Sequence, residues 1–220
     1  MRSLFTAALV ALACVAAGPA AAEDVSIEYE GRTLLGTLTV PEGKRPADGL
    51  VLLVHGTRGH KDMEIMRGLR QTLADRGFAA LAVTLSLQQD ARTGMHPCAD
   101  GVHRHTHGGA VPEIAAWVDW LKAERDARFI TVLGHSRGGS QVALYATRHD
   151  DPAVERLILM APMTFETYEA PEGLVEKARD MAPQAVMAEV PLLGCPATEV
   201  TAESVLSYYG PEPEKDPPVL

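Results

Sequence analysis

The stretch Phe129-Ile-Thr-Val-Leu-Gly134-His-Ser136-Arg-Gly138-Gly139 decides the fold that we predict for this chain. An apolar, β-branched run leads into the pattern Gly-x-Ser-x-Gly, and residues 140–147 then have a composition typical of a helix. A strand, a tight turn with serine at its tip, and a helix together form a nucleophile elbow. The flanking glycines fit this interpretation, because a Cβ at either position would collide with the neighbouring strand or helix. The pattern predicts that the Ser136 hydroxyl projects from the sheet at a helix N-terminus, where amide groups favour developing negative charge. The alternative is a Gly-rich turn without chemistry.

Apolar runs alternate with amphipathic segments on both sides of this stretch. Residues 25–29 and 32–40 predict two strands around a turn, 50–54 and 78–85 predict buried strands, and 154–160 predicts a further strand. Residues 62–76 and 111–125 have helical spacing. Asp62 is a candidate cap for the first of these helices. Strands that alternate with helices indicate an α/β fold with a mostly parallel, doubly wound sheet and helices on both faces.

The pattern changes after Pro162. Residues 171–188 and 202–209 predict helices, and we expect no strand between 163 and 209. This region is therefore predicted to be a small helical cap over the carboxyl edge of a core that spans residues 23–162. Residues 210–220 contain four prolines and predict an extended tail.

Residues 1–22 have the pattern of a secretory signal peptide. Arg2 precedes an apolar run from Leu4 to Ala17, and Pro19-Ala20-Ala21-Ala22 provides small residues for cleavage before Glu23. A membrane anchor is the alternative, but the apolar run is short for a span. The sequence predicts a periplasmic or secreted protein with no membrane span after cleavage.

The composition of the chain excludes some classes of binding partner and predicts the oxidation state of its cysteines. The net charge of −9 argues against nucleic acid and anionic membranes as partners. No phosphate loop or dinucleotide fingerprint is present, so we expect no cofactor, and the oligomeric state stays open. With Cys14 in the leader, Cys98 and Cys195 remain, and an oxidising compartment favours a disulfide between them over two separate buried thiols.

From about Val25 to Pro162 the sequence resembles the α/β-hydrolase fold family. The resemblance lies in the turn His55-Gly56 after the third strand and in the Gly-x-Ser-x-Gly motif after the fifth. It implies a serine hydrolase that cleaves small-molecule carboxylic esters by acyl transfer, and the leader predicts that this hydrolase is exported. Ser136 would be the nucleophile, the N–H groups of Thr57 and Arg137 would form the oxyanion hole, and His55, Gly56, Gly134 and Gly138 would shape the turns.

The sequence departs from this family in its C-terminal part. The resemblance implies a triad acid after the seventh strand and a base histidine after the eighth, whereas the last histidine here is His149. Three explanations for the missing histidine stay open. The fold is C-terminally truncated, or another chain supplies the missing edge of the sheet with its acid and base. Alternatively, the base comes from the Ser86–Gly109 segment. Glu166, or Glu169, is a possible substitute acid. As the chain stands, we expect weak or no activity, because a serine without a base is a poor nucleophile.

The Ser86–Gly109 segment is long, polar and rich in histidine. His103, His105 and His107 would share one side of an extended segment, and three imidazoles could hold Zn²⁺, Ni²⁺ or Cu²⁺. His96 lies earlier in the same segment. The alternative is a polar loop whose histidines make local hydrogen bonds. A metal at the His96–His107 loop would fit a second function class, a non-catalytic periplasmic binding protein.

Overall fold

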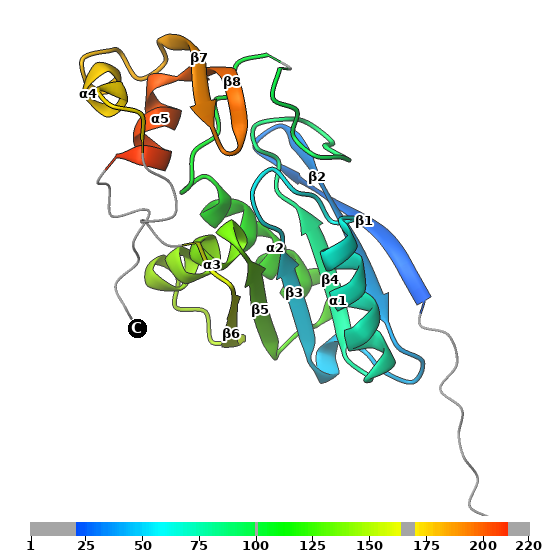
Figure 1. Cartoon of the computed structure of the whole chain (residues 1–220). Coiled ribbons are helices and arrows are strands. Elements are labelled where there is room, and N and C mark those ends of the chain that lie inside the picture. The colour runs from blue at the N-terminus through cyan, green and yellow to red at the C-terminus, as the bar shows by residue number, and fades with distance from the viewer. Residues whose placement is uncertain (1–20, 100, 164–169, 211–220) are drawn as a thin grey trace, which may run out of the picture.

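The computed structural model describes residues 21–99, 101–163 and 170–210. A six-stranded sheet forms its centre (Figure 1). The strands are β1 (Ala21–Tyr29), β2 (Arg32–Val40), β3 (Leu50–Val54), β4 (Ala79–Thr84), β5 (Ile130–His135) and β6 (Val154–Met160). Their spatial order is β1-β2-β4-β3-β5-β6. The first two pairs in that order are antiparallel, and β4, β3, β5 and β6 run parallel. The predicted α/β class and mostly parallel sheet are confirmed.

Helices cover both faces of this sheet. The helix α1 (Glu64–Asp75) lies on one face, and α2 (Ala110–Arg125) and α3 (Arg137–Arg148) lie on the other. Alternate side chains of a strand point to opposite faces. In β3, Leu52 and Val54 accordingly join the core that contains Trp117 of α2, while Leu53 packs with Met66 of α1. Burial on both sides explains why the sequences of these strands are continuous apolar runs.

The region after Pro162 differs from the prediction, because it contains a hairpin. Its elements are α4 (Leu174–Arg179), β7 (Val186–Leu192), β8 (Cys195–Thr201) and α5 (Ala202–Tyr209). The expectation that no strand lies here is wrong, and so is a helix over the whole of 171–188. Leu193 and Gly194 both have positive φ, +54° and +81°, which suits a two-residue hairpin turn. Pro183 lies beyond the end of α4, where it cannot continue a helix.

These elements form a cap with an apolar cluster of its own. The cluster includes Ala178, Leu192, Val200 and Val205, which come from all four elements of the cap. In Figure 1 the cap lies beyond the carboxyl ends of β3, β4 and β5.

Several element boundaries also differ. Helix α1 begins after Met63 without a side-chain cap, because Asp62 instead pairs with Lys61 at 3.0 Å. Helix α3 begins at Arg137, immediately after the elbow serine. Strand β1 begins at Ala21, two residues before the predicted cleavage position. The rest of the predicted leader, Glu166 and the tail beyond 210 lie outside the described residues.

Strand β6 forms one edge of the sheet as far as the structure describes the chain. Its apolar side chains Ile158 and Leu159 are 46% and 39% exposed, unlike the buried side chains of β3 and β4. Exposed apolar edges favour pairing with other chains. In the described ranges, no helix is both long enough and apolar enough to cross a bilayer.

Candidate active site

Ser136 lies at the junction between β5 and α3 and has the strained backbone expected of an elbow. Its φ is +55° and its ψ is −125°, a combination that non-glycine residues rarely adopt. The Ser136 N–H donates to the Met160 carbonyl at 2.9 Å, and its own carbonyl accepts from the Gly139 N–H at 2.8 Å. These bonds fix the turn while the serine stays partly exposed.

The neighbouring glycines are required by close backbone approach. A Cβ on Gly134 would lie 2.2 Å from the Gly138 carbonyl oxygen, and one on Gly138 would lie 2.4 Å from the His55 oxygen. A Cβ on Gly56 would come within 3.0 Å of the Ser136 Cβ. The His55-Gly56 turn after β3 therefore packs directly against the elbow.

His55 holds that turn in place and is unsuited to act as a base. Its Nδ1 donates to the Gly56 carbonyl at 2.8 Å, and its Nε2 accepts from the Leu85 N–H at 3.0 Å. Burial, with a smaller effect of the Arg92 charge, lowers the pKa of His55 to about 3. Both ring nitrogens are engaged and the ring is neutral, so its contribution is to orient the backbone.

The structure brings together the two residues predicted for the oxyanion hole. Arg137 is the first residue of α3, and Thr57 lies in the turn after β3. The Arg137 Nε donates to Thr57 Oγ1 at 3.2 Å, and the Arg137 guanidinium lies 4.8 Å from the centre of the Tyr208 ring in the cap. Amides of a first helical turn point out of the helix end. The oxyanion role of these residues stays a prediction.

No hydrogen bond joins the Ser136 hydroxyl to a histidine or carboxylate in the part of the chain that the structure describes. His149 is exposed and stacks on Tyr145, with ring centroids 4.7 Å apart. Glu166 and Glu169 lie outside the described residues. The base and the acid of a triad are therefore not identified by the geometry.

Two arginines attach the Ser86–Gly109 segment to the turn after β3. The Arg58 Nη1 donates to the His96 carbonyl at 3.0 Å, and the His96 N–H donates to the Arg58 carbonyl at 2.9 Å. The buried Arg92 donates to the carbonyls of Leu85 and Gly59 at 2.6 Å and 2.7 Å. These contacts place the segment beside the elbow and its adjoining turn. Sequence reasoning assigned no role to either arginine.

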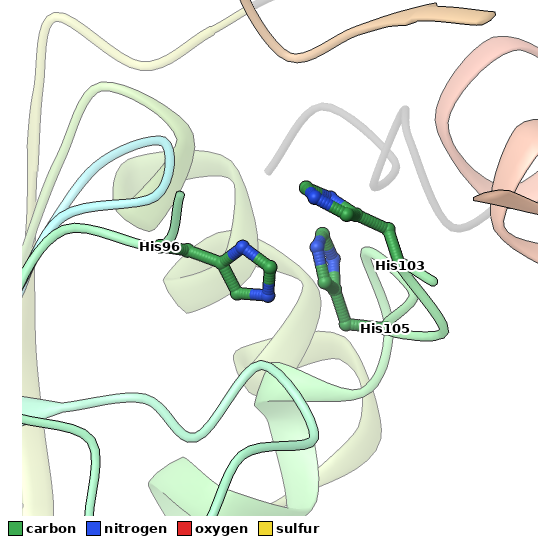
Figure 2. A group of neighbouring side chains, drawn as sticks. All are labelled: His96, His103 and His105. Carbon is green, nitrogen blue, oxygen red and sulfur yellow. The ribbon is translucent and has the colours of Figure 1, made fainter. Parts of the chain in front are cut away.

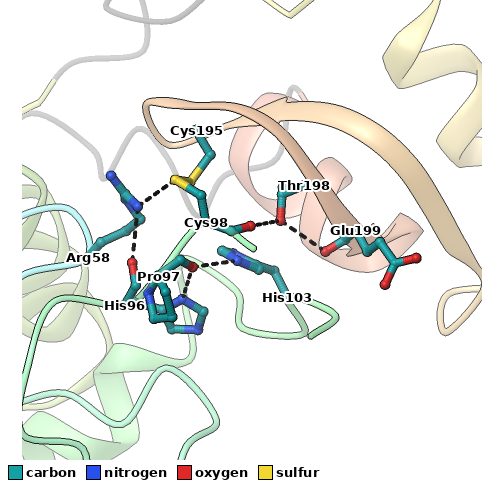
Figure 3. The surroundings of a disulfide bond; sticks show 8 residues. All are labelled: Arg58, His96, Pro97, Cys98, His103, Cys195, Thr198 and Glu199. Carbon is teal, nitrogen blue, oxygen red and sulfur yellow. Dashed lines mark hydrogen bonds between the residues drawn. A yellow bond between two sulfur atoms is a disulfide. The ribbon is translucent and has the colours of Figure 1, made fainter. Parts of the chain in front are cut away.

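The predicted disulfide between Cys98 and Cys195 is confirmed (Figure 3). It joins residues 97 apart in sequence and ties the segment to the first residue of β8. The Thr198 hydroxyl donates to the Cys98 carbonyl at 2.8 Å beside it. The cap and the histidine-rich segment are thus connected covalently.

The structure groups His96 with His103 and His105, whereas the sequence predicted a group of His103, His105 and His107. His96, His103 and His105 are buried and face one another (Figure 2), and a nitrogen from each lies within 4.8 Å of the others. His107 is not part of this group, since its N–H donates to the Ser207 hydroxyl at 2.8 Å, beside α5. The segment bends, so the alternation of an extended strand does not hold from 103 to 107. The sequence held one indication that His96 belongs to this group, because His96 lies two residues before Cys98, which forms the disulfide.

Comparisons with known proteins agree with the architecture. The sequence profile described as the alpha/beta hydrolase fold matches residues 49–218. No curated protein sequence matches the chain significantly.

Two solved proteins illustrate the structural likeness. Est1E from Butyrivibrio proteoclasticus is 22% identical with a TM-score of 0.58, over 84% of this chain and 68% of that chain. A structure of Est1E with bound ferulic acid gives a TM-score of 0.59 at 22% identity, over 84% of this chain and 70% of that chain. Dienelactone hydrolase from Anabaena variabilis is 20% identical with a TM-score of 0.50, over 63% of this chain and 62% of that chain. These likenesses show the shared fold.

Proposed function

Because the chain belongs to the α/β-hydrolase fold family, we propose that it is a serine hydrolase that cleaves carboxylic esters by acyl transfer through Ser136. The observation that carries the proposal is the position of this serine. It occupies a strained turn between a parallel strand and the N-terminus of α3, and close backbone contacts hold it there. This geometry suits attack on a carbonyl carbon.

The proposed chemistry proceeds in two steps. The Ser136 Oγ forms a bond to the ester carbonyl carbon, and the carbonyl oxygen takes the negative charge. The bond from the carbonyl carbon to the alkoxy oxygen breaks, and the alcohol leaves with a proton that replaces the one Ser136 released to solvent. Water then attacks the acyl-enzyme, which releases the acid and restores the Ser136 hydroxyl. In this proposal the N–H groups of Thr57 and Arg137 receive the oxyanion, and each such donor is worth about 3 kcal/mol of transition-state stabilisation.

We expect a low rate from this chain. A hydroxyl without a hydrogen-bonded base must transfer its proton to solvent during attack, which removes most of the advantage of a triad. Ser136 is partly exposed and no described histidine or carboxylate bonds to it. The remaining rate acceleration would then come from the Ser136 nucleophile and the oxyanion hole.

The test compares the protein with a Ser136→Ala variant on p-nitrophenyl acetate and butyrate. The expected result is slow turnover that the variant loses, together with a fluorophosphonate label on Ser136 in the unaltered protein. Ser26→Ala changes an exposed serine on β1 and should keep both signals. Equal rates for Ser136→Ala and the unaltered protein, with no label, would contradict the proposal.

Export is a further part of the proposed function. The arrangement of charge, apolar run and small residues in 1–22 supports it. The disulfide is compatible with an oxidising compartment such as the periplasm or the exterior.

A further inference from the structure

Three buried imidazoles meet where the Ser86–Gly109 segment contacts the cap (Figure 2). The side chains of His96, His103 and His105 are almost fully inaccessible, and their residues are 1–3% exposed. Their ring centroids lie 4.3, 5.1 and 5.3 Å apart. Polar rings are rarely gathered in an interior without a partner for their nitrogens.

One nitrogen of each ring has a hydrogen-bond partner. The Pro97 carbonyl accepts from His96 Nδ1 at 3.0 Å and from His103 Nε2 at 3.1 Å, as Figure 3 shows. His105 Nδ1 lies 2.8 Å from the Tyr208 hydroxyl. Histidines that bind metals usually have their second nitrogen fixed by such a carbonyl or polar group.

The remaining nitrogens have the properties of ligand atoms. His103 Nδ1 and His105 Nε2 are buried and make no hydrogen bond in the described residues. Because His96 and His103 use one nitrogen as a donor to a carbonyl, the other nitrogen of each neutral ring carries a lone pair.

We propose that His96, His103 and His105 bind a divalent first-row transition-metal ion, with Zn²⁺ as the ion that suits three imidazoles best. One nitrogen from each residue lies within 4.8 Å of the others. Ligand nitrogens on a tetrahedral zinc ion are about 3.3 Å apart, so small ring rotations bring all three to the ion. Three protein ligands leave a fourth position open.

The backbone around the cluster is held firmly. The disulfide fixes Cys98, between His96 and His103. The His103 N–H donates to the Glu199 carbonyl at 2.8 Å, and the His103 carbonyl accepts from the Thr201 N–H at 3.0 Å. A metal site needs this kind of support to keep its ligands in place.

The nearby charges indicate what would occupy the fourth position. The Arg58 Nη1 donates to the His96 carbonyl at 3.0 Å, and the Arg137 guanidinium lies 4.8 Å from the centre of the Tyr208 ring, whose hydroxyl contacts His105. No carboxylate belongs to the cluster. This positive field works against a bare dication and favours an anionic fourth ligand, such as hydroxide or a carboxylate. A bound metal would also engage these three histidines, so none of them would then serve as a base for Ser136.

The experiment uses full-length protein without a histidine tag and with its disulfide intact. After treatment with a chelator and dialysis, Co²⁺ is added and its visible absorption recorded, and Zn²⁺ binding is measured by calorimetry. We expect one equivalent of Co²⁺ with the spectrum of a tetrahedral site, and its displacement by Zn²⁺. Absence of binding by both ions to the folded protein would overturn the proposal.

Variants and spectroscopy locate the ion. His96→Gln and His105→Gln should weaken binding at least tenfold, while His149→Gln, which changes an exposed histidine, should leave it unaltered. Zinc X-ray absorption on the unaltered protein does not depend on whether a variant folds. Three imidazole ligands per ion support the site, whereas sulfur ligands or fewer than three imidazoles would refute it.

Tyr208→Phe tests the positioning of His105. Removing the hydroxyl takes away the partner of His105 Nδ1 and should weaken Zn²⁺ binding by about tenfold. The tetrahedral Co²⁺ spectrum should persist, because all three ligands remain. Loss of that spectrum would assign the hydroxyl itself to the metal and contradict the proposed ligand set.

Discussion

Ser136 has a backbone conformation, φ +55° and ψ −125°, that costs about 1–3 kcal/mol for a residue other than glycine. The surrounding packing enforces this conformation. The carbonyls of Val54 and His55 pass so close to Gly138 that no side chain fits there, and the Gly138 carbonyl excludes one from Gly134. Strain that the surroundings impose on one residue is typical of a functional position.

Gly134→Ala should destabilise the protein severely. The new Cβ would lie 2.2 Å from the Gly138 oxygen and 2.6 Å from the Gly139 nitrogen, which are backbone atoms that cannot rotate away. Overpacking of this kind costs about 3 kcal/mol, which lowers the Tm by about 6–12 °C in a chain of this size. Thermal unfolding followed by circular dichroism measures the change.

Gly68→Ala is the matched control for that substitution. Gly68 lies within α1, and a Cβ there would meet no atom within 4 Å. The same chemical change should stabilise the protein by about 0.5–1 kcal/mol, because alanine favours the helix. Similar Tm values for the two variants would show that the elbow is less tightly packed than described.

At the scale of elements, the Ser86–Gly109 segment has little regular structure and is positioned by its neighbours. Arg58 and Arg92 attach it to the turn after β3, and the disulfide attaches it to β8. The Ser207 hydroxyl of α5 accepts from the His107 N–H farther along the segment. The cap thus holds the histidine-rich segment over the sheet, and the disulfide connects both parts.

Removing the disulfide should therefore loosen the cap. Cross-linking two residues 97 apart restricts the unfolded chain, and in the chain-entropy account a loop of this length contributes about 4 kcal/mol or more. The double variant Cys98→Ser and Cys195→Ser should lower the Tm by about 10 °C. Differential scanning calorimetry measures this loss.

Reduction provides the control. Dithiothreitol should lower the Tm of the unaltered protein by a comparable amount and leave the double variant unaffected. If the double variant keeps the original Tm, the disulfide does not stabilise the arrangement of the cap.

At the scale of the whole molecule, an acidic chain of net charge −9 folds around a sheet with one partly exposed apolar edge. The pattern of residues 1–22 predicts export, and β1 begins just inside that pattern, at Ala21. Ala21 and Ala22 are exposed and pair with Val40 and Thr39 at the end of the strand. Cleavage before Glu23 would remove the leader and, from β1, only the two exposed residues Ala21 and Ala22.

Expression in a bacterium with an intact export pathway tests the leader. We expect the protein in the periplasmic fraction, beginning at Glu23 by mass spectrometry and containing one disulfide. Ala22→Arg should block cleavage, because the residue before the cut must be small. A cytoplasmic protein that keeps Met1 and free thiols would contradict the prediction of export.

Much of the fold could be predicted because it depends on local patterns. Buried parallel strands need apolar side chains on both faces, so the run at Leu50–Val54 identified a strand with those bounds. The turn at Ser136 needs glycine on both sides, so the pattern Gly-x-Ser-x-Gly after an apolar run is enough to indicate an elbow. The cap hairpin was missed because its strands alternate irregularly and break register between Met187 and Val190.

The sequence by itself determined the order of strands and helices as far as Met160, and also the elbow, because these depend on residues close together in the chain. It also determined the disulfide, because only one pairing of cysteines is possible outside the leader. Only the tertiary structure decided which histidines meet. His96 joins His103 and His105 because the disulfide and Arg58 bend the segment, while His107 turns toward α5. Such a grouping depends on contacts with β8 and α5, which lie about a hundred residues away in the chain.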